Sequence, residues 1–208
     1  MYYNRIMKKT FIGIICLALI FGTYFFFIYK TPITNKNSTG QTIVAFGDSL
    51  VYGTGSTQGN DFVSLVSNEL GEPIINLGVP GNTSASGLAR IEEVIALKPK
   101  IVIVLFGGND FLQKIPIDTT FQNIDEIVTR IHNTGSAVIL LGVRGGLLTD
   151  PYADRFEEIA KNRNTAYVPN ILSGLIGNTS RMSDAIHPND TGYKIIADKV
   201  LTVFTKEF

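Results

Sequence analysis

The sequence predicts an α/β fold: a three-layer α/β/α sandwich with a five-stranded parallel sheet, preceded by an N-terminal transmembrane helix. Short apolar runs without polar alternation indicate strands that are buried on both faces, as in a parallel sheet. Segments of helical period lie between these runs, and such alternation favours right-handed crossovers that cover both faces of the sheet. A charge-free apolar run near the start of the chain predicts the transmembrane helix.

Residues 1–30 are expected to form a membrane anchor. Three basic residues precede an uncharged run, Phe11–Tyr29, whose length approaches the ~20 residues that span a bilayer. The basic flank predicts a single-pass protein of the cell membrane, with everything after Lys30 outside the cytoplasm. A cleaved signal peptide, and hence a secreted protein, is the alternative, although no small-residue cleavage site follows the run. Cys16, the only cysteine, lies within it, so no intramolecular disulfide can form.

The remainder of the chain divides into a linker and one folded body. Residues 31–41 are polar and rich in turn-forming residues, which predicts a linker, and residues 42–208 form the expected catalytic domain. Helical segments are expected around residues 62–70, 88–95, 124–131, 156–160 and 195–203. The expected strands are Ile43–Phe46, Pro73–Leu77, Ile101–Phe106, Ala137–Leu141 and Ala166–Val168. Because doubly wound sheets bind ligands at the carboxyl ends of their strands, functional residues are expected just after residues 46, 77, 106 and 168.

The polar residues at these positions can supply every part of an acyl-transfer site. Ser49 follows the first strand and precedes a helical turn, and it is the candidate nucleophile. The backbone N–H groups of Ser49 and Gly81 and the carboxamide of Asn109 are candidate oxyanion donors. His187 is the candidate base, and Asp184 is expected to orient it. Each turn alone has a purely structural explanation, but together the four segments favour catalysis.

The sequence contains two histidines, and it favours His187 over His132 as the base. His132 ends the third helical segment, where a surface histidine is favourable at a helix C-terminus. His187 stands three residues after Asp184, within reach of its carboxylate. Residues 189–191 can cap the following helix by themselves, so helix capping does not explain His187.

At these residues the chain resembles the SGNH (GDSL) hydrolase superfamily. Gly-Asp-Ser-Leu at 47–50, Gly81, Gly-Gly-Asn-Asp at 107–110 and Asp184-x-x-His187 correspond in order to its four sequence blocks. The segment 81–90 and the small size are similar to its bacterial thioesterase/lysophospholipase/arylesterase branch. The resemblance covers residues 42–206 and implies a five-stranded parallel sheet, no metal and no cofactor. It also implies the triad and oxyanion-hole roles given above. Residues 144–150 do not match that branch, and they are a candidate lining for the acyl pocket.

The predicted function is therefore hydrolysis of carboxylic esters, thioesters or lysophospholipids through an acyl-enzyme on Ser49. The alternatives are a non-catalytic lipid- or glycan-binding module on the same fold and a carbohydrate deacetylase. A nucleotide binder is disfavoured, because the glycine-rich segment Gly53–Ser56 lacks a complete phosphate-binding motif. Equal numbers of basic and acidic residues, 18 each, give no reason to expect nucleic acid as a partner. The expected partners are the ester substrate and, through residues 11–29, the membrane; the body is expected to be monomeric.

Overall fold

The computed structural model describes residues 32–146 and 149–208. The chain divides into two units, Met1–Pro32 and Ile33–Phe208, and the sheet belongs to the second. The transmembrane helix expected at residues 11–29 lies outside the described residues. Within the described ranges, none of the helices has both the length and the apolar character needed to cross a membrane.

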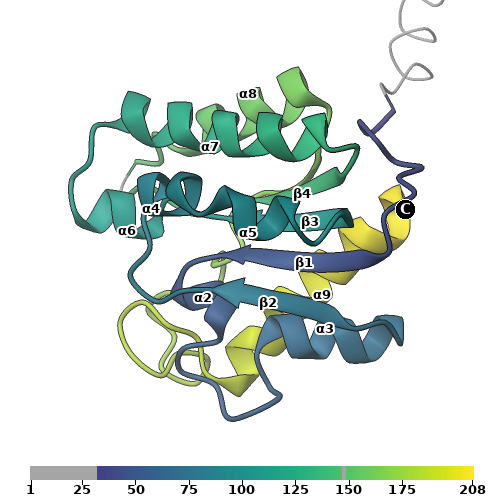
Figure 1. Ribbon diagram of the computed structural model, residues 1–208. Helices are drawn as coiled ribbons and strands as arrows, with labels where there is room; N and C mark the ends of the chain where they lie inside the picture. Colours follow the sequence, from purple (N-terminus) through teal and green to yellow (C-terminus); the bar gives the residue numbers. More distant parts are fainter. Residues whose placement is uncertain (1–31, 147–148) are drawn as a thin grey trace, which may run out of the picture. The chain divides into compact units, whose positions relative to one another are not determined.

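Five parallel strands form one sheet in the order β2-β1-β3-β4-β5 (Figure 1). The register places Val44 of the first strand between Ile75 and Val102 of its two neighbours. The three inner strands are buried almost throughout, which explains their unbroken apolar runs. The strands are β1 Thr42–Gly47, β2 Ile74–Gly78, β3 Pro99–Leu105, β4 Ala137–Leu141 and β5 Ala166–Val168. The predicted α/β fold with a five-stranded parallel sheet is confirmed.

Helices cover both faces of this sheet (Figure 1). On one face α3 (Phe62–Leu70) packs with α9 (Asp190–Glu207), and on the other α4 (Ser84–Ala89) and α5 (Ile91–Ile95) pack with α7 (Ile117–Asn133). Helix α8 (Ala153–Arg163) lies beside α7 and contacts β5. Two short helices, α2 (Ser49–Tyr52) and α6 (Gly108–Leu112), begin directly at strand ends. The layers thus leave the carboxyl ends of the strands available for a site.

Arg90 separates two helices where the periodicity of residues 88–95 predicted one. Its backbone leaves the helical region, with φ −112° and ψ 18°. Its guanidinium donates to the carbonyl oxygens of Gly47 and Leu77 at 2.9 Å each and stacks on the Phe46 ring at 4.4 Å. The helix therefore breaks where the arginine side chain joins the carboxyl ends of β1 and β2.

The segment expected to be a linker is partly attached to the body. Ile33 packs against the core, and the Thr34 N–H and hydroxyl donate to the carbonyls of Asn164 and Arg163 at 2.9 and 3.0 Å. The Asn35 carboxamide donates to the carbonyls of His132 and Ser136. Within the segment predicted to be a linker, residues 33–35 therefore contact the body. Their hydrogen-bond partners precede β4 and β5, so these residues lie at the end of the sheet where the strands begin.

Candidate active site

Ser49 is presented by the abrupt turn from β1 into α2. The Asp48 carboxylate caps this helix, accepting the Leu50 N–H at 2.9 Å. A Cβ at Gly47 would lie within 3.2 Å of the Val51 Cβ and closer still to the Leu105 carbonyl. Only glycine allows the strand to turn this closely against its neighbour. The turn leaves Ser49 half-buried at the carboxyl end of the sheet.

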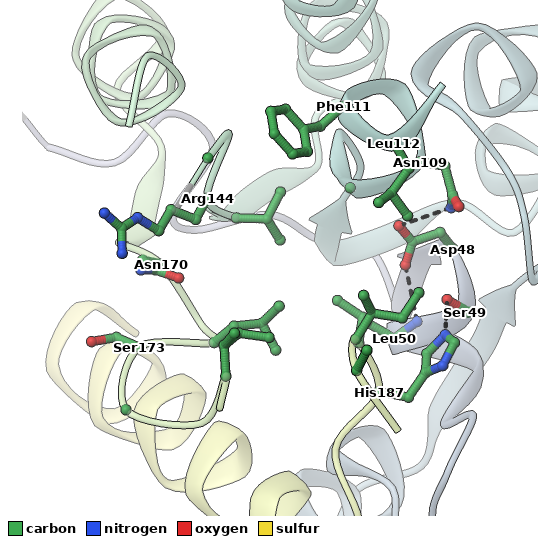
Figure 2. Close-up of a pocket in the computed structure, with 18 residues that line it drawn as sticks. Asp48, Ser49, Leu50, Asn109, Phe111, Leu112, Arg144, Asn170, Ser173 and His187 are labelled. Atoms are coloured by element: carbon green, nitrogen blue, oxygen red, sulfur yellow. Dashed lines mark hydrogen bonds between the residues drawn. The ribbon is translucent and has the colours of Figure 1, made fainter. Parts of the chain in front are cut away.

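His187 joins Ser49 to Asp184 in a continuous hydrogen-bonded chain, and Figure 2 shows its contact with Ser49. Its Nε2 lies 3.0 Å from the Ser49 hydroxyl, and its Nδ1 lies 2.7 Å from Asp184 Oδ2. Asp184 Oδ1 also accepts the backbone N–H groups of Ile186 and His187 at 2.8 and 2.7 Å. These bonds, led by the one from His187, lower the pKa of Asp184 to about 2. An ionised Asp184 favours the Nδ1–H tautomer, which leaves Nε2 free to accept the serine proton.

Asn109, in α6, lies on the same pocket as Ser49. Its carboxamide N–H₂ donates to the Asn82 carbonyl at 2.9 Å and, with a long contact of 3.4 Å, to Asp48 Oδ2. The longer contact is the weaker one, so one N–H of Asn109 can be redirected to a ligand at low cost.

Gly81, like Asp184, does not line this pocket. It is exposed in the turn after β2, with φ +82°. The following residue, Asn82, links this turn to the site, because its carbonyl accepts from Asn109 and its side-chain oxygen accepts from Arg90 at 2.7 Å. The structure therefore brings Ser49, His187, Asp184 and Asn109 together, with Gly81 one residue from the cluster.

Two buried carboxyl groups at the site were not singled out from the sequence. Burial raises the pKa of Asp48 to about 7, against the hydrogen bond from Leu50 N–H. Asp110 is fully buried and accepts the Ser84 N–H and hydroxyl at 2.8 and 2.5 Å. It thereby fixes the start of α4 to the helix that carries Asn109. The only sign in the sequence that these two residues belong to the site is their position, since Asp48 precedes Ser49 and Asp110 follows Asn109. The residue type alone does not reveal that an acidic side chain is buried.

His132 does not belong to this cluster, as its placement in the sequence indicated. It is half-buried, not on the surface as predicted, and its Nε2 is buried with no hydrogen-bond partner among the described residues. Burial lowers its pKa to about 4, so the packed imidazole is neutral at pH 7.

A cavity of about 480 Å³ opens beside Ser49 and His187 (Figure 2). Its wall is largely apolar, with α6, the segment after β4, and residues 170–176 and 185–187 contributing. The apolar side chains are Leu50, Phe111, Leu112, Val143, Leu172, Ile176 and Ile186. The expectation that the loop beginning at Arg144 lines the pocket is confirmed for Arg144 and Gly146. The carboxyl end of β4, which was not among the expected positions, therefore also contributes to the site.

A serine hydrogen-bonded through histidine to an ionised carboxylate, at the carboxyl ends of a doubly wound sheet, defines the class of serine hydrolases. The chain belongs to the GDSL-like Lipase/Acylhydrolase family, whose sequence model matches residues 45–195.

The similarity to named proteins extends over most of the chain. It is 29% identical over 185 residues to the esterase TesA of Pseudomonas aeruginosa, covering 83% of this chain and 86% of that protein. It is 23% identical to the thioesterase 1/protease 1/lysophospholipase L1 of Escherichia coli, covering 86% and 90%. A crystal structure of TesA superposes with a TM-score of 0.76 at 27% identity, over 81% of this chain and all of that one.

Proposed function

We propose that the protein hydrolyses carboxylic esters of apolar acyl groups, with Ser49 as nucleophile, His187 as general base and Asp184 as the residue that orients the base. One observation carries the proposal: the imidazole of His187 bridges the Ser49 hydroxyl and an ionised Asp184 at the mouth of an apolar cavity. The family of ester-cleaving enzymes to which the chain belongs, and the named activities of its relatives, support the same reaction.

The reaction proceeds in two acyl transfers. Ser49 Oγ attacks the ester carbonyl carbon while His187 Nε2 takes its proton, and the protonated imidazole then gives that proton to the departing alcohol. A water molecule attacks the resulting acyl-enzyme with the same base and releases the acid. Negative charge on the carbonyl oxygen is stabilised by the Ser49 N–H and by the Asn109 N–H that is now directed weakly at Asp48. Gly81 N–H is a third proposed donor, from the turn that the Asn82 carbonyl links to Asn109.

The apolar wall favours an acyl chain longer than acetyl. Seven large apolar side chains line the cavity, and each methylene group removed from water contributes about 0.8 kcal/mol. This contribution would be lost with a carbohydrate acetyl ester. Lysophospholipids and thioesters share the acyl part and are substrates of the same proposed site. A panel of acetyl to palmitoyl esters with acetylated sugars would separate these classes.

Substitution of the proposed nucleophile and base tests the mechanism. Ser49→Ala, His187→Ala and the double variant should all fold and should each lose at least about 10³-fold in kcat, with the double variant little worse than either single one. A fluorophosphonate should label the unsubstituted protein and Ser180→Ala, a loop serine outside the pocket, but not Ser49→Ala. Normal turnover by His187→Ala would contradict the proposal, and an unlabelled, inactive natural protein would favour a binding module.

We further propose that residues 11–29 anchor the protein in the cell membrane, with the catalytic body outside the cytoplasm. The length of that uncharged run and the basic residues before it support this location. The full-length protein should stay with membranes during carbonate washing, and added protease should reach its body in intact cells. Mature protein in the medium that begins after residue 29 would show instead that the segment is a cleaved signal.

A further inference from the structure

One wall of the proposed acyl pocket is a loop that follows β5. This wall loop, residues 170–176, brings the apolar side chains of Leu172 and Ile176 to the cavity. Figure 2 shows Ser173 of the same loop across the cavity from His187. The position of the wall loop therefore sets how much of an acyl chain the cavity can enclose.

Apolar burial attaches the wall loop to the core. Ile171 and Leu175 are fully buried and are spaced four residues apart, like Leu172 and Ile176 on the pocket side. The Ile171 N–H also donates to the Gly142 carbonyl at 2.9 Å. Apolar contacts are non-directional, so they keep the loop folded against the body without fixing its carbonyl groups.

Lys199 of α9 fixes two of these carbonyl groups. Its ammonium group donates to the carbonyl oxygens of Ile171 and Ser173 at 2.9 Å each. The side chain is half-buried, and its partial removal from water lowers the pKa of the amine. The two carbonyl oxygens replace part of the lost hydration, and hydrogen bonds from a charged donor are roughly twice as strong as neutral ones. Lys199 therefore joins the wall loop to α9.

Arg181 joins the wall loop to the segment that carries His187. Its guanidinium donates to the Gly174 carbonyl at 3.0 Å, and its own carbonyl accepts the Asn189 N–H at 3.0 Å. Arg181 and Asn189 therefore close the base of the segment on which His187 stands.

Helix α9 connects these two attachments. Asn189 caps it by accepting the Gly192 N–H at 3.2 Å, and the part of the helix between Asp190 and Lys199 spans roughly 14 Å. The hydrogen-bonded backbone of a helix is stiff over this length, so α9 is a fixed frame between His187 and Lys199. The two cationic side chains link this frame to the wall loop.

We propose that Lys199 and Arg181 are positioning residues that set the acyl-chain preference of the enzyme by holding the wall loop at a fixed distance from His187. This inference rests on the proposed function and deepens it, because it identifies what controls the choice of substrate at the same site. Attack by Ser49 on an acetyl ester does not require the wall loop. A longer chain does, since each methylene group that the cavity encloses is removed from water and raises kcat/KM by about fourfold.

A series of p-nitrophenyl esters from acetyl to decanoyl tests this proposal in the full-length protein. Lys199→Met keeps the apolar part of the side chain and removes both hydrogen bonds to the loop. Its loss in kcat/KM should be smallest for the acetyl ester and at least about tenfold for the ester that the natural protein prefers, the effect of about two methylene groups no longer enclosed. The loss should appear mainly in KM, because the wall contacts the acyl chain equally in the bound substrate and in the transition state. Arg181→Met removes one hydrogen bond and should show a smaller loss with the same dependence on chain length.

Two control variants assign the effect to the donated hydrogen bonds. Lys199→Arg retains donors for both carbonyl oxygens and should keep the natural dependence on chain length. Lys194→Met removes an exposed lysine of the same helix that lies outside the pocket, and it should leave the whole series unchanged. Labelling of Ser49 by a fluorophosphonate shows in each variant that the catalytic residues remain assembled.

The possible failures are distinguishable. A loss in Lys199→Met that is absent, that is the same at every chain length, or that Lys199→Arg shares would overturn the positioning role while ester hydrolysis by Ser49 stands. A Lys199→Met protein that is not labelled leaves the test to Arg181→Met, and an unchanged series in that variant would equally overturn the role. Hydrolysis of no ester by the natural protein would overturn the proposed function itself.

Discussion

Asp48 shows how strongly a single residue at this site depends on its surroundings. It stands between Gly47 and Ser49, is only 2% exposed and caps α2. Removal from water raises the pKa of its carboxyl from 3.8 to about 7; the negative charge of Asp110 adds to the effect, while the Leu50 N–H and the charge of His187 oppose it. The residue beside the proposed nucleophile therefore carries a proton over much of the acidic range.

This shift gives stability a pH dependence at one residue. Because the folded state holds the proton of Asp48 more tightly than the unfolded state, its stabilising contribution is fully present below about pH 4 and is lost as the pH rises through about 7. Asp48→Asn keeps an acceptor for the Leu50 N–H and removes the titration. The free energy of unfolding of the variant relative to the natural protein should therefore increase by about 2–4 kcal/mol from pH 4 to pH 8. Urea unfolding across that range measures it, and a constant difference would contradict the assignment.

At the scale of elements, the glycine-rich loop after α2 supports the segment that carries His187. A Cβ at Gly55 would lie 2.5 Å from the Pro188 carbonyl and 3.2 Å from the His187 Cβ. Thr57 donates from its N–H and hydroxyl to Asp190 at 2.7 Å each, at the start of α9. Gly55 thus permits close packing of two loops, which accounts for a glycine in a segment that lacks a complete phosphate-binding motif.

Alanine at two of these glycines separates backbone strain from displacement of the histidine. Gly55 and Gly59 both have positive φ, +98° and +81°, but nothing lies within 4 Å of a Cβ at Gly59. Backbone strain alone should destabilise both variants by about 1–2 kcal/mol, and Gly55→Ala should lose more, because its Cβ also meets the Pro188 carbonyl. Only Gly55→Ala pushes on the backbone beside His187, so it alone should lower kcat, by at least tenfold. Equal kcat values for the two variants, measured at a temperature where both are folded, would show that the loop contact does not position His187.

Within the body, Ile33–Phe208, the proposed active site and the attachment of the N-terminal segment lie at opposite ends of the sheet. Ser49 and Asn109 follow the carboxyl ends of β1 and β3. Asn35 is bound to the carbonyls of His132 and Ser136, just before β4 begins. Changes at residues 33–35 should therefore affect the stability of the body and leave the chemistry intact.

Two truncations test this separation. A protein beginning at Pro32 keeps the contacts of Ile33, Thr34 and Asn35, whereas one beginning at Thr39 loses them. The shorter protein should be less stable by about 2–4 kcal/mol in urea unfolding, from one partly buried apolar side chain and several hydrogen bonds. Both should have the same kcat on soluble short-chain esters under conditions where they are folded. A lower kcat for the folded shorter protein would mean that the two ends of the sheet are coupled.

The sequence by itself determined the strands, their parallel arrangement and the residues that meet at their ends. Unbroken apolar runs require burial on both faces of a sheet. The carboxyl ends of parallel strands share one edge, so the sequence predicted that Ser49, Asn109 and His187 belong to one site. Periodicity did not predict the break at Arg90, because it reports a buried face and not the turn that a long side chain imposes between helices.

Only the tertiary structure decided which groups lose contact with water and which distant ones meet. His187 contacts Ser49 across 138 residues of sequence, and Arg144 meets the same pocket as Asn170 from another strand end. The burial that shifts the pKa of Asp48 and the contacts that fasten Asn35 come from elements far along the chain. Solvation, hydrogen-bond partners and cavity shape depend on all the elements packed around a residue, whereas local sequence patterns report only the residue's own element.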